Sequence, residues 1–133
     1  PVARDQLARF WIESEVNRLT NWRASQLRAK GTPGPEGSVG KMAMAGLNQR
    51  LMAFVMELLG PDAMLYPGGY PMDRPTTAMD LSKPQKAFLR VQANSIEGGT
   101  TNIMKNILSE RVLGLPGEPR ADKDVPWSEV PRS

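Results

Sequence analysis

The chain has 133 residues, and its 17 Lys and Arg against 14 Asp and Glu give a formal net charge of +3, too mild to indicate a strongly basic nucleic-acid binder. With 40% hydrophobic and 23% charged residues, the composition is that of one soluble globular domain with one core of ordinary size. The absence of Cys and His excludes zinc sites, iron–sulfur clusters, thiol nucleophiles and Ser-His-Asp triads.

The first predicted element is a long amphipathic helix over residues 1 to about 30. Its apolar residues recur in steps of 4, 4, 3 and 3, which is helical spacing on one face: Ala8, Ile12, Val16, Leu19 and Trp22. Phe10 and Trp11 widen this apolar stripe enough to suggest more than one packing partner. We therefore expect the stripe to form part of the core.

A loop rich in Gly and Pro follows at residues 30–38. The next segment, Gly40-Lys41, is reminiscent of a phosphate-binding loop, but Pro35 and Met42 stand where that motif needs Gly and Ser or Thr. We interpret Ser38 instead as the cap of a second helix.

The second predicted helix, residues 39–59, is apolar on nearly every side and contains four of the eight Met. Such a helix is expected inside a bundle or at a subunit interface, and Gly60 followed by Pro61 ends it. Residues 60–79 are then predicted to form an extended surface loop and a candidate contact surface.

The third helix is expected to begin at a capping box formed by Ser82 and Gln85, with Pro84 in its first turn. Lys83, Lys86 and Arg90 line one side of it, which favours a solvated cationic face, with an anionic ligand as the alternative partner of this row.

The fourth helix is predicted from Thr101 to Leu113 and ends at Gly114. Residues 116–133 hold four Pro without periodicity, so we expect a tail, which Trp127 is a candidate to pin down. No strand pattern or repeat is present. The prediction is an all-α, four-helix antiparallel bundle over residues 1–115 with a Pro-rich tail over 116–133.

The turn before the fourth helix is the most informative local feature. Gly98 and Gly99 feed directly into a helix start, where unpaired backbone N–H groups present partial positive charge to an anion such as a phosphate. Thr100 and Asn102 add side-chain donors. The same pattern also suits a tight turn between two helices without any ligand.

The sequence around this turn, ANSIEGGTTNIMKNIL at 93–108 and RVLGLP at 111–116, resembles the C-terminal signature of the acyl-CoA dehydrogenase family. The earlier helices also resemble the family's C-terminal helical bundle without its first helix. Because the chain opens at Pro1 without an initiator Met, we expect a processed product or part of a longer protein.

The resemblance implies a flavoprotein oxidoreductase that converts an acyl-CoA thioester to 2-enoyl-CoA in fatty acid or lipid β-oxidation. Hydride passes to FAD and then to an electron-transfer acceptor. It implies FAD contacts from Gly99, Thr100, Thr101 and Asn102, and a homotetramer or heterotetramer built through the bundle. No metal, nucleic acid or membrane span is expected, and the expected location is the cytoplasm.

Two positions depart from the family's pattern. The catalytic Glu of many members stands where this chain has Gly98, which leaves Glu97, one residue earlier, as the candidate base. Glu57 and Gly60 fall where members usually contact the FAD of a neighbouring subunit, and Glu57 replaces the usual Gln with a negative charge.

The leading hypothesis is therefore the FAD-contacting, tetramer-forming domain of an acyl-CoA dehydrogenase, inactive without the remaining domains. The alternative is a non-catalytic helical scaffold or association module, or a non-catalytic subunit of a heteromeric dehydrogenase.

Overall fold

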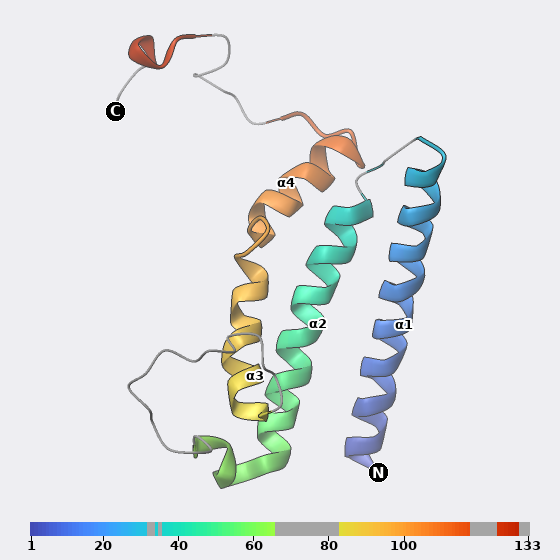
Figure 1. Cartoon of the computed structure of the whole chain (residues 1–133), viewed down its shortest axis with the longest axis vertical. Coiled ribbons are helices and arrows are strands. Elements are labelled where there is room, and N and C mark those ends of the chain that lie inside the picture. Colours follow the sequence, from blue (N-terminus) through green and yellow to red (C-terminus); the bar gives the residue numbers. More distant parts are fainter. Residues whose placement is uncertain (32–33, 35, 66–82, 118–124, 131–133) are drawn as a thin grey trace.

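The computed structural model of the chain describes residues 1–31, 34, 36–65, 83–117 and 125–130. It contains four α-helices, which are α1 (Val2–Ala29), α2 (Glu36–Leu59), α3 (Pro84–Val91) and α4 (Thr101–Arg111) (Figure 1). Three short 3-10 helices accompany them, which are η1 (Gly60–Met64), η2 (Gln92–Ser95) and η3 (Trp127–Glu129). The described residues include no strand, and the predicted all-α, four-helix fold is confirmed.

Helix α2 is the element against which the others pack. Helix α1 runs antiparallel along one side of it, and α3 and α4 follow one another along the other side, joined by η2 and a short turn (Figure 1). Because α3 and α4 together form one column, the helices make three columns side by side. In such an arrangement each helix has one side that no other helix covers.

The core is accordingly small. The buried apolar side chains among the described residues are Ala24, Ala45, Leu47, Ala87, Val91 and Met104. Within this chain α2 is not buried on nearly every side, because Met44 and Leu58 are exposed and most of its other apolar residues are only half-buried. Its alternative place at a subunit interface stays a prediction. The prediction of one core of ordinary size is wrong for the described residues.

Helix α1 packs against α2 through a face beside its apolar stripe, and Ile12 and Val16 of the stripe line a hollow with Val39 and Ala43 of α2. Its contacts with α2 include the Phe10 and Phe54 rings, whose centroids lie 5.7 Å apart, and an ion pair between Glu13 and Arg50. The stripe itself stays 48% to 60% exposed at Ile12, Val16, Leu19 and Trp22. The prediction that this stripe belongs to the core is therefore wrong within this chain, because α1 meets α2 through a neighbouring face that includes Phe10 and Glu13.

The ends of α2 confirm one prediction and correct another. The helix begins at Glu36, so Ser38 lies inside its first turn and is not the cap. At the other end, α2 stops at Leu59 as predicted, because Gly60 adopts a positive φ of 57°.

The start of α3 also differs from expectation. Its N-cap is Lys83, which makes no side-chain capping bond, and Pro84 occupies the first turn as predicted. The Gln85 Nε2 group donates to the Asp62 carbonyl oxygen at 3.1 Å and does not reach back to its own helix. The capping-box prediction is therefore wrong at Gln85, because η1 offers a nearby acceptor that the local sequence does not reveal.

Parts of the loop and tail lie outside the described residues. Of the loop expected at 60–79, residues 60–65 are described, and five of them form η1. Ser82 and the Trp127 side chain lie outside the described part of the chain. The boundary between a bundle at 1–115 and a tail at 116–133 stays a prediction.

Candidate functional site

The turn between η2 and α4 requires its two glycines. Gly98 and Gly99 have φ values of 63° and 100°, in the left-handed region that L side chains rarely adopt. A Cβ atom on Gly99 would also come within 2.4 Å of the Met104 Cε atom. The two left-handed glycines therefore form the short turn between η2 and α4, and the Met104 side chain lies against Gly99.

Thr100 caps α4. Its Oγ1 atom accepts a hydrogen bond from the Ile103 N–H at 3.3 Å. The N–H groups of Thr101 and Asn102, the first two of the helix, have no intrahelical acceptor, and the described residues supply none. Two backbone donors at the positive end of a helix dipole form an arrangement that can bind an anion.

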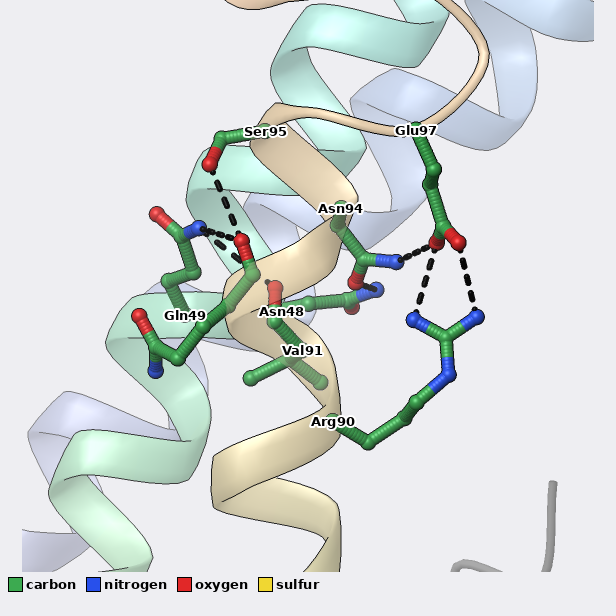
Figure 2. A network of polar contacts seen from close by, with 8 residues as sticks. Asn48, Gln49, Arg90, Val91, Asn94, Ser95 and Glu97 are labelled. Carbon is green, nitrogen blue, oxygen red and sulfur yellow. Dashed lines mark hydrogen bonds and ion pairs between the residues drawn. The ribbon is translucent and has the colours of Figure 1, made fainter. Parts of the chain in front are cut away.

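Both carboxylate oxygens of Glu97 accept hydrogen bonds from its own chain (Figure 2). Arg90 Nη1 and Nη2 donate to Glu97 Oε1 and Oε2 at 3.0 and 2.8 Å, and Asn94 Nδ2 donates to Oε1 at 2.8 Å. Asn94 Oδ1 in turn accepts from Asn48 Nδ2 of α2 at 3.3 Å. Glu97 is thus linked through this network to α3, η2 and α2.

These contacts lower the pKa of Glu97. The hydrogen bonds from Arg90 contribute most and the bond from Asn94 comes next, while the positive charges of Arg90 and Lys41 act in the same direction and partial desolvation opposes them. A carboxylate with a lowered pKa is a weaker proton acceptor. The role of Glu97 as a base stays a prediction, and the observed contacts are structural.

Lys41 makes a contact with the turn that the sequence does not predict. Its Nζ group donates to the carbonyl oxygen of Gly99, so α2 holds the turn directly. The sequence drew attention to Lys41 only because it follows Gly40, as in a phosphate-binding loop. No local pattern connects Lys41 with a residue 58 positions later.

The second group of expected cofactor residues lies elsewhere. Glu57 is exposed near the end of α2 and Gly60 begins η1. Glu57 comes 16 residues after Lys41 on the same helix, a separation of about 24 Å along its axis. Within one chain, the structure therefore does not bring Glu57 and Gly60 to the turn that holds Gly99 and Asn102.

The described residues hold neither a cluster of metal ligands nor a helix suited to cross a membrane. No group of three or more His, Cys, Asp or Glu side chains is placed to hold a metal ion there. None of the helices in that part of the chain is both long and apolar enough to cross a membrane.

Comparison with known families gives one match that spans most of the chain. Residues 1–113 match the family described as acyl-CoA dehydrogenase, C-terminal domain. The chain belongs to the acyl-CoA dehydrogenase family. The matched region includes the double-glycine turn at Gly98 and Gly99.

Two curated relatives carry the same family name. The chain is 30% identical over 118 residues to acyl-CoA dehydrogenase IpdE1 of Mycobacterium tuberculosis, covering 89% of this chain and 28% of the relative. It is 25% identical over 118 residues to acyl-CoA dehydrogenase IpdE1 of Mycolicibacterium smegmatis, covering 89% of this chain and 26% of the relative. The chain thus spans between a quarter and a third of the length of these relatives. No solved structure matches the chain.

Proposed function

We propose that this chain is the C-terminal domain of an FAD-dependent enzyme that oxidises an acyl-CoA thioester to 2-enoyl-CoA. FAD supplies the hydride acceptor in this chemistry, and an electron-transfer partner reoxidises it. Family membership supports the reaction class. The observation that carries the proposal is the start of α4, where the N–H groups of Thr101 and Asn102 have no acceptor among the described residues. We expect the protein to act in the cytoplasm.

The residues of the turn fit an anionic part of the cofactor. At Gly98 the position of a Cβ is open space, so a phosphate can approach the backbone there, whereas Met104 Cε fills the corresponding space at Gly99. The exposed side chains of Thr100 and Asn102 offer further donors. We propose that Gly99, Thr100, Thr101 and Asn102 hold and orient the cofactor, and that the helix dipole of α4 favours its negative charge.

We also propose that the domain contributes to a tetramer. The uncovered stripe of α1, which includes Ile12, Val16 and Trp22, is a broad apolar surface of the kind that marks a protein interface. Glu57 and Gly60, distant from the turn of their own chain, are proposed to contact the cofactor of a neighbouring subunit. The negative charge of Glu57 disfavours a position directly beside a pyrophosphate.

The test is to express the gene with its native upstream sequence and to record the intact mass and visible absorption spectrum of the purified protein. A yellow protein several-fold heavier than 14.7 kDa, with a flavin spectrum that bleaches on addition of an acyl-CoA thioester, is the expected result. A colourless protein that gains no flavin when FAD is added contradicts the proposal.

One observation favours a second candidate, a non-catalytic subunit or association module. Gly98 stands where many family members carry their catalytic Glu, and both carboxylate oxygens of the neighbouring Glu97 accept hydrogen bonds from its own chain. Such a subunit would bind FAD or a partner subunit without turning over acyl-CoA alone. Co-expression with a catalytic partner would then be required for activity.

A further inference from the structure

We propose that Glu97 is a positioning residue and not the proton-abstracting base. Together with Lys41 it clamps the Gly98–Gly99 turn from two sides, and this clamp keeps the first N–H groups of α4 in place for the cofactor. The inference rests on the proposed FAD-dependent function and adds the residues that shape the cofactor-binding turn.

The first side of the clamp is built on α3 and η2. Arg90 meets both carboxylate oxygens of Glu97, and Asn94 adds a third donor (Figure 2). Asn48 of α2 fixes Asn94 in turn. Glu97 immediately precedes Gly98, so fixing its side chain sets where the double-glycine turn begins.

A further contact keeps η2 close to α2. Gln49 Nε2 lies 3.4 Å from each of the carbonyl oxygens of Val91 and Gln92, where α3 passes into η2 (Figure 2). This amide joins α2 to the segment that carries Asn94. The Glu97 network therefore rests on two helices, which makes its geometry resistant to small local motions.

The second side of the clamp comes from α2. Lys41 Nζ donates to the Gly99 carbonyl oxygen, on the residue just before the Thr100 cap. Gly98 lies between the two anchored residues. Because glycine loses more conformational freedom on folding than any other residue, two consecutive glycines need such external contacts to hold one conformation.

The same contacts make Glu97 a poor base. A proton taken from a substrate would have to bind a carboxylate whose Oε1 accepts from Arg90 and Asn94 and whose Oε2 accepts from Arg90, and protonation would weaken these bonds. The charged groups that face Glu97 are Arg90 of α3 and Lys41 of α2, and both favour its ionised form. These groups stabilise the carboxylate and reduce its tendency to accept a proton.

A charge swap in the full-length protein separates the two roles. Glu97→Arg and Arg90→Glu each place like charges together, and we expect each to weaken FAD binding at least tenfold. The double variant Arg90→Glu with Glu97→Arg restores the ion pair in reverse. We expect it to recover most of the FAD affinity and, per bound flavin, most of the kcat for acyl-CoA oxidation. Recovery should be incomplete, because Lys41 repels an Arg at position 97.

Other outcomes contradict the inference in distinct ways. If the double variant binds FAD like the unmodified protein but has lost turnover, Glu97 is the base. If the single variants bind FAD as tightly as the unmodified protein, the clamp does not position the cofactor. If the unmodified protein itself takes up no FAD, the proposed function fails and the inference fails with it.

Two further measurements keep the test decisive when a charge reversal impairs folding. Glu97→Gln keeps the size of the side chain, and its FAD affinity and kcat are measured after circular dichroism confirms the helical content. A positioning role predicts weaker FAD binding with kcat per bound flavin changed less than about threefold, whereas a base predicts normal binding and loss of kcat. Asp5→Asn, which breaks the exposed pair with Arg9 on α1, is the matched control and should change neither.

Discussion

Lys41 and Gly99 are 58 positions apart in the sequence, yet the Lys41 Nζ group donates a hydrogen bond to the Gly99 carbonyl oxygen. This contact joins the beginning of α2 to the turn that precedes α4. It is the one point in the described residues where the long central helix holds the backbone of the candidate cofactor site directly. The start of α4 is therefore positioned by tertiary contact as well as by its own capping residue.

Replacing Lys41 with Met tests this contact. Met retains an unbranched apolar stem but donates no hydrogen bond, so we expect a loss of about 1 to 2 kcal/mol in unfolding free energy. Amide hydrogen exchange in the first turn of α4 should become faster. Lys105→Met, at an exposed position of α4, is the control, and equal effects of the two substitutions would argue against a special role for Lys41.

The pKa of Glu97 predicts a pH dependence of stability. Its folded-state pKa is lowered from the ordinary value of 4.5, mainly by hydrogen bonds from Arg90 and then Asn94. The stabilisation is therefore complete above the unfolded-state pKa and is lost as the pH falls through the folded-state value. The urea midpoint of the unmodified chain should exceed that of Glu97→Gln near neutral pH, and the gap should shrink below about pH 4.5. A gap that is independent of pH would contradict this assignment.

Gly99→Ala should destabilise the chain by about 1 to 3 kcal/mol, because Ala rarely adopts a positive φ and its Cβ would meet the Met104 Cε atom. The measurement is urea unfolding followed by circular dichroism. Gly37→Ala is a sharp control. Gly37 lies inside α2 with open space around it, and there Ala should stabilise by about 0.5 to 1 kcal/mol. If Ala changes the unfolding free energy equally at Gly99 and at Gly37, the positive φ of Gly99 is not what makes its substitution costly.

Thr100→Ala removes the oxygen that caps α4 and should cost about 1 kcal/mol in unfolding free energy. Thr100→Ser retains that oxygen and should restore nearly all of the loss. If both variants lose the same stability in urea unfolding, the methyl group of Thr100 and not its capping oxygen is responsible.

The exposed stripe of α1 predicts a change in assembly and not in folding. Ile12→Ser combined with Val16→Ser should leave the helical content of the chain unchanged, because both side chains are more than half exposed. Light scattering after gel filtration should show a lower molar mass than for the unmodified protein. Leu47→Ser, at a buried position, should instead reduce helical content. An unchanged mass in the α1 variant would mean that the stripe is not the assembly surface.

Much of the secondary structure follows from local patterns. The long first helix, the end of α2 before Gly60 and the start of α4 at Thr101 were predicted from spacing, glycine and helix-start signals. The double-glycine turn was also identified from sequence as two glycines before a helix start. In the structure both glycines adopt the positive φ that few other residues adopt. These features depend on interactions between residues that are close together in the sequence, so the local sequence is enough to predict them.

Tertiary structure decided which surfaces and side chains meet. The periodicity of α1 groups Ile12 with Trp22 on one face, but only the packing against α2 reveals that this face stays uncovered. In the sequence, Glu97 is only a carboxylate beside a turn. In the structure it accepts three hydrogen bonds from Arg90 and Asn94, which tie the turn to the helices around it. Helical spacing determines which residues share a face, whereas the choice of partner depends on elements far away along the chain. Long side chains such as Lys41 find their acceptors only after those elements have come together.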